Sequence, residues 1–485
     1  MGSHEHPPGT TTRQLAILAG LLVCAVLVRV IGLFHHATMP DEAFTFFIAS
    51  QRFPAMIDLL KNGDFHPPLV YVIGHGLFAL SSRAYLFRIV SVIFGVVGVA
   101  ATYAVARRVI PRWAALATLF VAINPSLVFF DGLFRMYALL WSLCMISWAL
   151  LLWALDEPRL PARWVAYALC LAMLLYTQYL AFFTLAAQIA YIGIFYPRRT
   201  GFWLALAGAL VAFAPWIPIL LIQYPLGGTA YNAMHGHLSE MWQAAPVLLV
   251  DGLPPTLEFS PLLGVLLWIV IIAGLVLAVV QRRWLILALL APLAIQILYS
   301  SVSGKLLIGQ RYLLQAIPAL VFVVLLVVDQ LWQTRLRPLA LGFIAAVAVM
   351  MTAGTLDKHF LAQYMPVDWT TYRRFLDAKV QPNDGVVFDG SMTYYALIGS
   401  KAARSPSLFL IADQNEAAKL ATQAAKLPRV WLIDYESELS DPQRVAFSFL
   451  ARTHPQHVTW RSTQSGYGDF VLTTLFLPPA AKRGP

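Results

Sequence analysis

Residues 15–42 read LAILAGLLVCAVLVRVIGLFHHATMPDE, and this stretch holds both features that organise the rest of the chain. Its first twenty residues are apolar apart from Arg29, and about 20 residues is the length that an α-helix needs to cross a bilayer core. No small-residue cleavage site follows, so we expect a retained membrane span and not a signal peptide. Beyond the span lies an acidic pair, Asp41-Glu42, directly after Pro40. The stretch therefore predicts a membrane helix followed by carboxylates near the membrane surface.

Similar apolar runs recur as far as Gly354. Of the 485 residues, 59% are hydrophobic and 12% are charged, whereas an average soluble domain is about 25% charged. Mean hydropathy is +0.69. We therefore predict a polytopic α-helical membrane protein of about eleven membrane-spanning helices, near residues 15–34, 86–106, 113–131, 136–155, 164–178, 180–196, 202–222, 260–280, 284–300, 311–331 and 338–354.

The charge density changes near Gly354. Residues 1–354 hold 20 Lys/Arg and 12 Asp/Glu, whereas the much shorter segment 355–485 holds 14 and 12. Short apolar stretches in this second segment predict strands at 386–388, 408–411, 430–433 and 470–476, with helices at 415–426 and 441–451. We predict two domains: a transmembrane domain over 1–354 and a soluble α/β domain over 355–485.

Residues 35–85 are predicted to hold helices that lie beside the membrane. Within 43–60, apolar residues recur at helical spacing on one face, which predicts a helix in the membrane interface. The apolar stretch 69–80 is too short for a span, so we predict a second juxtamembrane helix there.

Basic residues occupy alternate loops, and the positive-inside rule makes those loops cytosolic. We therefore expect a plasma-membrane protein with a cytosolic N-terminus and an extracytoplasmic C-terminal domain. Because the net charge of +10 arises largely in these short loops, we expect no nucleic-acid partner. The basic loop residues are Arg107, Arg108, Arg112, Arg159, Arg163, Arg198, Arg199, Arg282, Arg283, Arg335 and Arg337.

Four arginines stand instead at the outward ends of predicted spans. A charge within the membrane costs roughly 2.5–3.5 kcal/mol on insertion scales and often marks a functional site, although a single arginine can reach the headgroups by snorkelling. Four at one depth favour a common anion site, because the guanidinium fork suits phosphate. Lys305 would add to this site. The four residues are Arg29, Arg88, Arg135 and Arg311.

Two further features belong to the same outward side. The pair Asp41-Glu42 either stabilises the first turn of a helix through the helix dipole or supplies a general base. His66, in His66-Pro67-Pro68-Leu69, stands where the prolines would start the next helix, and a structural role suits it equally.

No metal site is predicted. His35, His36, His235 and His237 lack a convincing metal-ligand spacing. The three cysteines lie within apolar runs and suggest neither a zinc site nor a disulfide framework.

These motifs, in this order, resemble the GT-C superfamily of membrane glycosyltransferases. The resemblance is closest to the family-39-like branch, which contains protein O-mannosyltransferases and lipid A aminoarabinose transferase, and it covers residues 10–330. It is carried by Asp41-Glu42, His66-Pro67-Pro68-Leu69, Leu86-Phe87-Arg88-Ile89-Val90-Ser91, Arg135-Met136-Tyr137 and Arg311-Tyr312-Leu313-Leu314.

The resemblance implies inverting transfer of a monosaccharide from a polyprenyl-phosphate donor to a hydroxyl outside the cytosol. Asp41 takes the place of the base, Arg311 that of the phosphate-binding arginine, and Glu42 and His66 are supporting residues. Val70 follows the His-Pro-Pro-Leu motif, where protein mannosyltransferases commonly have Gly-Lys, which weakens the case for a protein acceptor. A lipid, glycan or protein acceptor therefore stays open.

Sugar transfer from a lipid phosphate needs a base and cations, which the predicted carboxylates and arginines would supply. A lipid phosphate leaves readily when cations stabilise it, and the acceptor hydroxyl needs only a base within hydrogen-bond reach. Two alternatives stay open. A transporter or flippase of lipid-linked saccharides would favour inverted repeats, which the sequence lacks, and a lipid-diphosphate-dependent glycan polymerase or ligase would bind two phosphates.

Overall fold

The structure is a computed structural model of the 485-residue chain. It describes residues 12–33, 39–81, 83–234, 241–253, 257, 260–303, 307, 309–360, 369–397, 400–411, 414–435, 441–462 and 471–477. The chain divides into two compact units. The first, here called the membrane unit, comprises residues 1–35 and 49–359, and the second, the C-terminal unit, comprises 36–48 and 360–485. Each unit is described by itself.

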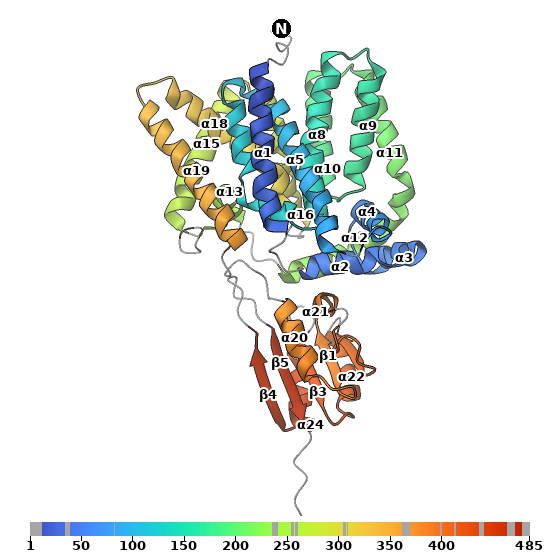
Figure 1. The fold of residues 1–485 in the computed structure, drawn as a ribbon. Coiled ribbons are helices and arrows are strands. Elements are labelled where there is room, and N and C mark those ends of the chain that lie inside the picture. Colours follow the sequence, from blue (N-terminus) through green and yellow to red (C-terminus); the bar gives the residue numbers. More distant parts are fainter. Residues whose placement is uncertain are drawn as a thin grey trace, which may run out of the picture. The chain divides into compact units, whose positions relative to one another are not determined.

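Long apolar helices stand side by side in the membrane unit (Figure 1). Within the described residues, eight helical segments are long and apolar enough to cross a membrane. They are α1 (Thr12–Leu33), α5 (Ala84–Val109), α8 (Met136–Asp156), α11 (Thr200–Phe213) continuing into α12 (Ile217–Met234), α15 (Pro261–Val280), α16 (Trp284–Ser303), α17 (Gln310–Leu313) continuing into α18 (Ile317–Trp332), and α19 (Arg337–Phe360).

The other three predicted spans are also apolar helices, but they are bent or short. The segment Pro111–Ala122, which includes α6 (Ala114–Ala122), meets α7 (Pro125–Asp131) at a bend of 53°. The bend falls where Asn124 caps α7, its side chain accepting a hydrogen bond from the Leu127 N–H at 3.1 Å. Helices α9 (Pro161–Leu175) and α10 (Ala181–Phe195) have 15 residues each, fewer than the roughly 17 that a span needs. The polytopic membrane fold is thus confirmed, and the number of crossings stays a prediction.

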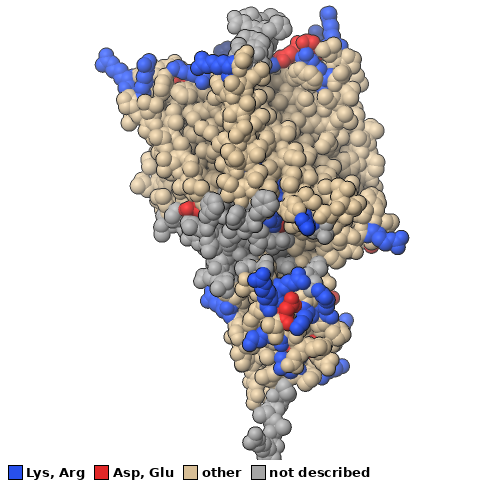
Figure 2. Space-filling model, viewed as in Figure 1, with Lys and Arg blue, Asp and Glu red and all other residues tan. Residues whose placement is uncertain are grey.

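The helices differ in how deeply they are buried within the unit. Helix α18 lies almost wholly inside it, whereas α1 exposes apolar side chains such as Leu15, Val23 and Leu27. Exposed aliphatic side chains suit contact with lipid tails, which are as apolar as leucine. Figure 2 shows Lys and Arg side chains along one rim of the membrane unit and a wide band below with almost no charge. Helix α1 begins at the basic rim and α19 ends at the opposite end of the bundle (Figure 1).

Residues 40–78 form three short helices, α2 (Pro40–Ala49), α3 (Phe53–Gly63) and α4 (Leu69–Phe78). The prediction of one helix over 43–60 is wrong, because the chain breaks at 50–52. Pro54 explains the break: proline has no N–H to donate and its ring clashes with a preceding turn, so it fits only the first turn of a helix. Helix α3 lies across the end of the bundle that is opposite the basic rim (Figure 1). The helix predicted over 69–80 is present as α4.

The predicted outer loop 223–259 is partly helical. It contains the end of α12 and also α13 (Met241–Val250). After α13 the backbone turns at Gly252, which has a φ of +84°, a conformation that glycine adopts at little cost. A Cβ atom added to Gly252 would lie 2.5 Å from the Gly354 carbonyl oxygen. The backbone just after α13 is therefore in close contact with the backbone of α19 at Gly354.

The C-terminal unit contains a five-stranded mixed sheet in the order β2-β1-β3-β5-β4. Strand β1 pairs in parallel with β2 and β3, whereas β5 pairs antiparallel with β3 and β4. The strands are β1 (Gly385–Asp389), β2 (Leu408–Ile411), β3 (Val430–Asp434), β4 (Gln456–Arg461) and β5 (Leu472–Leu477), and the helices are α20 (Trp369–Lys379), α21 (Ser391–Ala396), α22 (Gln414–Ala424) and α24 (Val445–Thr453).

Helices cover both faces of this sheet, as the alternation of side chains along its strands requires. On one face Val386 and Phe388 join a core cluster with Leu376 of α20. On the other face Val387 packs in a cluster with Ala417 of α22 and Leu450 of α24. This arrangement confirms the predicted α/β class.

Topology can be tested with two single cysteines. In a background without Cys24, Cys144 and Cys170, we expect a cysteine at Ser391 to react with a membrane-impermeant thiol reagent on intact cells and a cysteine at Arg283 to be spared. The reason is that Arg283 lies in a basic loop, which the positive-inside rule places in the cytosol. The opposite labelling pattern would place the candidate site on the cytosolic side.

Candidate functional site

A buried carboxylate–imidazole pair lies between α3 and α4 in the membrane unit. The Asp64 Oδ1 atom lies 2.8 Å from His66 Nδ1 and accepts a 2.7 Å hydrogen bond from the Phe65 N–H. The Tyr71 hydroxyl, on α4, donates to Asp64 Oδ2. Asp64 and His66 are only 3% and 5% exposed. The local sequence explains the geometry, because Pro67 and Pro68 limit the backbone between the pair and α4.

Electrostatics determine which group of the pair carries the proton. Burial raises the pKa of the Asp64 carboxyl, but the charge and hydrogen bond of His66 and the nearby charge of Arg135 hold that pKa below its ordinary value. Asp64 is therefore an ionised acceptor at neutral pH. An ionised carboxylate can only accept, so His66 Nδ1 carries a proton and donates it.

Arg135 is a predicted anion-binding residue whose charge acts on this pair. It is 3% exposed at the start of α8, its guanidinium carbon lies 5.9 Å from the Tyr137 ring centre, and its charge acts on both Asp64 and Tyr71. The sequence indicated Arg135 and His66 separately. Their common partner Asp64 was missed, because a single loop aspartate has no distinguishing pattern.

The other cations predicted to bind the anion differ in their burial and in their contacts. Arg88 is 3% exposed and donates to the Leu33 carbonyl oxygen over 3.3 Å. Arg311 is half-buried, with its guanidinium carbon 5.2 Å from the Tyr312 ring centre. Lys305 lies outside the described residues. The convergence of Arg88, Arg135 and Arg311 on one anion stays a prediction.

Arg29 has a partner inside the bundle. Its Nε donates to Asp131 Oδ2 at 2.8 Å and its Nη1 to the Ala122 carbonyl oxygen at 2.8 Å. Trp141 Nε1 donates to the other oxygen of Asp131 over 2.8 Å. Both members of the ion pair are fully buried, so we assign Arg29 to helix packing and not to the anion site.

A second buried network lies beside Arg311. Lys358 of α19 pairs with Asp251, whose Oδ2 also accepts a 2.6 Å hydrogen bond from the Ser126 hydroxyl. Gln310 donates to the same hydroxyl oxygen over 3.1 Å. The network thus ties α19 and the start of α7 to the helix that carries Arg311.

The predicted base and its neighbour lie in α2. Residues 36–48 belong to the C-terminal unit, in which Phe44 and Phe47 of α2 contact the Tyr395 ring, with centroid distances of 4.9 and 5.0 Å. Asp41 is half-buried and Glu42 is fully buried. That Asp41 serves as a base beside the arginines of the membrane unit stays a prediction.

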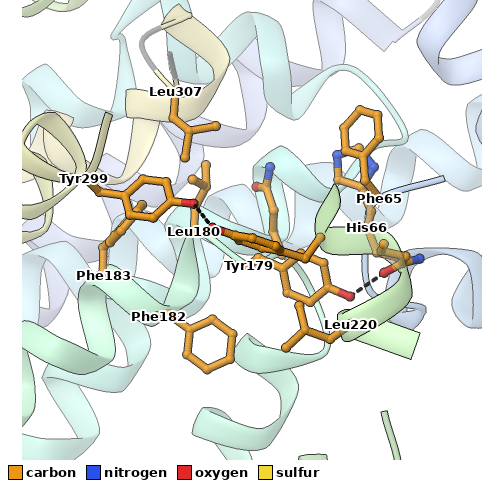
Figure 3. Close-up of a pocket in the computed structure, with 12 residues that line it drawn as sticks. Phe65, His66, Tyr179, Leu180, Phe182, Phe183, Leu220, Tyr299 and Leu307 are labelled. Atoms are coloured by element: carbon orange, nitrogen blue, oxygen red, sulfur yellow. Dashed lines mark hydrogen bonds between the residues drawn. The ribbon is translucent and has the colours of Figure 1, made fainter. Parts of the chain in front are cut away.

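A cavity of about 330 Å³ opens next to His66. Side chains from several parts of the membrane unit line it: the α3–α4 loop, the turn between α9 and α10, helices α10, α12 and α16, and Leu307 beyond α16 (Figure 3). The lining has polar groups at His66, Gln178 and Gln223. Its aromatic members are Phe65, Tyr179, Phe182, Phe183, Tyr224 and Tyr299.

Hydrogen bonds hold the wall of this cavity in place. The Tyr179 hydroxyl donates to Gln223 Oε1 (Figure 3). It also accepts a 3.0 Å hydrogen bond from Trp216 Nε1. Gln223 Nε2 in turn donates to the Leu60 carbonyl oxygen over 2.6 Å. Burial raises the pKa of Tyr179, so its phenol stays neutral. None of the described residues that line the cavity is Lys, Arg, Asp or Glu, and sequence analysis gave no indication of the cavity.

Comparisons with known proteins agree on one fold. No family model matches the chain, and no curated protein matches it. Among solved structures, ArnT from Cupriavidus metallidurans bound to undecaprenyl phosphate aligns over 97% of this chain and 99% of its own, with a TM-score of 0.53 and 13% identity. The archaeal oligosaccharyltransferase AglB from Archaeoglobus fulgidus, in complex with an inhibitory peptide and a dolichol-phosphate, aligns over 95% and 74%, with a TM-score of 0.55 and 13% identity.

A further structure of the Archaeoglobus fulgidus oligosaccharyltransferase, in complex with Zn and sulfate, aligns over 86% of this chain and 67% of its own. Its TM-score is 0.51 at 12% identity. The protein therefore shares its fold with ArnT and with the Archaeoglobus oligosaccharyltransferase, which confirms the predicted fold class. In this fold the chain places a buried Asp64–His66 pair and Arg135 beside an aromatic cavity.

Proposed function

We propose that this protein is an inverting glycosyltransferase that moves a monosaccharide from a polyprenyl-phosphate donor to an acceptor hydroxyl. The observation that carries the proposal is the buried group of Arg135, Asp64 and His66 next to a cavity whose described lining is largely aromatic, in a fold shared with ArnT bound to undecaprenyl phosphate and AglB bound to dolichol-phosphate. A polyprenyl-phosphate sugar has an anionic phosphate, which would suit the arginine, and a sugar and lipid portion, which would need a cavity.

The anionic part of the donor would meet the arginines. Arg135 is buried at the outward end of the bundle, where the low dielectric strengthens its attraction for a phosphate oxygen. Arg311 and Arg88 are the further candidates for this role, with Lys305. Stabilising the negative charge that grows on the departing polyprenyl phosphate is the step these cations would assist.

The acceptor hydroxyl needs a proton acceptor. We assign this role to Asp41, with Glu42 and His66 supporting it. In an inverting transfer the base takes the hydroxyl proton while the acceptor oxygen bonds to the sugar's anomeric carbon, and the carbon–oxygen bond to the phosphate breaks. No general acid is required, because a phosphate monoester anion is a sufficient leaving group.

The proposed location is the outer face of a bacterial plasma membrane. The basic residues lie along one rim of the membrane unit, and helices α3 and α4, which flank the Asp64–His66 pair, lie toward the other end (Figures 1 and 2). By the positive-inside rule the basic rim is cytosolic. The acceptor is a lipid, glycan or protein hydroxyl on the opposite side.

We predict that chelators leave the activity unchanged. Within the described residues no group of three or more His, Cys, Asp or Glu side chains is placed to hold a metal ion, and arginines can stabilise a monophosphate leaving group. The Archaeoglobus enzyme's complex with Zn makes this a sharp test. Activity that is lost with EDTA and restored by one divalent cation would contradict the prediction and would direct attention to Asp41, Glu42 and His66.

Ligand binding tests the proposed donor class. Purified protein is titrated with polyprenyl phosphate, polyprenyl diphosphate and neutral polyprenol of equal chain length. We expect the monophosphate to bind at least about 10-fold more tightly than the polyprenol, as charge-assisted hydrogen bonds require. Equal affinity for phosphate and polyprenol would overturn the proposal, and a clear preference for the diphosphate would support the polymerase or ligase alternative.

A further inference from the structure

We propose that the membrane unit binds an anionic phospholipid in a second cavity, which lies among the basic loops, and that it does so through the phosphate of the lipid headgroup. This cavity has a volume of about 280 Å³ and lies where α5 and α10 end and where α15 turns into α16. The described residues that line it are all different from those that line the cavity beside His66. The inference goes beyond the proposed function and does not depend on it.

Arginines give this cavity its charge. Arg108, Arg282 and Arg283 line it, and none of the described lining residues is Asp or Glu. Arg108 is already paired, because its Nη1 donates to Asp156 Oδ1 over 2.8 Å and its Nη2 donates to Oδ2 of the same carboxylate. Within the part of the chain that the structure describes, Arg282 and Arg283 form no ion pair. Two uncompensated guanidinium groups therefore belong to the cavity, and their fork geometry suits a phosphate.

The turn after α15 places these two arginines next to each other. The Arg282 N–H donates to the Val279 carbonyl oxygen over 3.0 Å, and the Arg283 N–H donates to the Ala278 carbonyl oxygen over 2.7 Å. Arg282 has a φ of +55°, a left-handed conformation that glycine usually supplies just after a helix. The chain thus has arginine where the backbone favours glycine, which indicates a role for the side chain.

Aromatic residues show which phase this cavity adjoins. Tyr191, Tyr196 and Trp284 line it, and tyrosine and tryptophan are enriched at the headgroup level of membranes. The Phe195 ring, also in the lining, lies 5.2 Å from the Tyr191 ring and 6.2 Å from the Trp284 ring, measured between centroids. Phe195 and Trp284 are 41% and 42% exposed. Exposed rings at the surface of a membrane bundle contact lipid, so a headgroup reaches the arginines directly from the bilayer.

A soluble phosphate is the competing ligand, because its chemistry is the same as that of the headgroup. Two observations favour the lipid. The exposed rings beside the arginines would contact acyl chains, which a soluble anion lacks. The volume of about 280 Å³ is also below the roughly 300–1,000 Å³ typical of pockets for whole small molecules, and it suits a headgroup whose chains stay outside. Basic pockets between transmembrane helices bind anionic headgroups in this way.

Lipid binding by two double variants tests this assignment. Purified protein in a non-ionic detergent is titrated with phosphatidylglycerol, which is anionic, and with phosphatidylcholine, whose choline balances the phosphate charge. Bound lipids are counted by native mass spectrometry. The cavity variant is Arg282→Gly with Arg283→Gln, since glycine removes the guanidinium and suits the backbone of the turn. The control is Arg159→Gln with Arg335→Gln, which removes two exposed basic-loop charges outside the cavity.

We expect wild type to prefer phosphatidylglycerol and the cavity variant to bind it about 25-fold more weakly. A basic residue near an anionic membrane surface contributes about 5-fold to binding, and two are removed. The control should bind phosphatidylglycerol with nearly wild-type affinity. Equal losses in the two variants would show a general effect of surface charge and would overturn the proposal. Unchanged binding in the cavity variant, or no lipid preference in wild type, would overturn it as well.

Inorganic phosphate distinguishes the two sources of the anion. Wild type with bound phosphatidylglycerol is exposed to sodium phosphate or to sodium chloride at equal ionic strength, so that screening is the same in both. We expect the two salts to displace the lipid to the same small extent. Selective displacement by phosphate would show that the cavity takes the soluble ion and would overturn the lipid assignment. Because these measurements involve no sugar donor, their outcome is separate from that of the proposed glycosyl transfer.

Discussion

Asp41→Asn is expected to lower turnover by at least about 100-fold while the donor still binds. The substitution keeps the shape of the side chain and removes its ability to accept a proton, and general-base catalysis contributes about 100- to 10,000-fold. Donor binding should persist because the phosphate is assigned to the arginines. Turnover and donor affinity are measured separately on the purified protein, the first from released polyprenyl phosphate and the second by equilibrium titration.

Asp58→Asn is the matched control for this experiment. Asp58 is an exposed carboxylate on α3 whose side chain accepts a hydrogen bond from Asn62 at 3.0 Å, and we expect its variant to turn over at the wild-type rate. Near wild-type turnover in Asp41→Asn would remove Asp41 from the mechanism. Glu42, which is fully buried one residue later, would be the next candidate.

Arg311→Ala is expected to weaken binding of the intact donor and of free polyprenyl phosphate alike, by about 10- to 100-fold. Hydrogen bonds to charged groups contribute about 1.5–3 kcal/mol, and both ligands carry the phosphate that Arg311 would contact. Lys305→Ala should have a much smaller effect, since a lysine offers phosphate only a point charge. The measurement is a titration of each variant with both lipids.

Arg112→Ala is the control for loss of a cation. Arg112 lies in a basic loop at the opposite rim, partly exposed, with its Nη1 atom 3.9 Å from Asp329 Oδ1. Its variant should bind both lipids as wild type does. Equal donor affinity in wild type and Arg311→Ala would exclude Arg311 from the site and leave Arg135 as the principal cation.

The membrane fold could be predicted from sequence because span length and apolar composition are local properties. All eleven predicted spans coincide with apolar helices, including the short α9 and α10. The break between α2 and α3 was missed because the spacing of apolar residues continues across it. Strand β4 was missed because it is polar and mostly exposed, so it lacks the apolar pattern that marked the other strands.

The site was predicted only in part, because its contacts join residues far apart in the chain. His66 and Arg135 carried family-like motifs, but the role of Asp64 depends on a hydrogen bond that no pattern encodes. Arg29 pairs with Asp131, 102 residues away, and Lys358 with Asp251, 107 residues away. Nothing in the sequence around Gln178 indicates that it lines a cavity with aromatic side chains. Burial and pairing of this kind follow from tertiary packing and not from local sequence.

The most direct test of the central claim is turnover of a lipid-linked sugar by the purified protein. The protein is reconstituted in liposomes with a panel of polyprenyl-phosphate monosaccharides and with bacterial envelope extract as the source of acceptor. We predict that one donor is consumed and that free polyprenyl phosphate appears in equal amount, with the sugar attached to an acceptor. Movement of the intact donor across the bilayer, without release of polyprenyl phosphate, would contradict the account and identify a transporter.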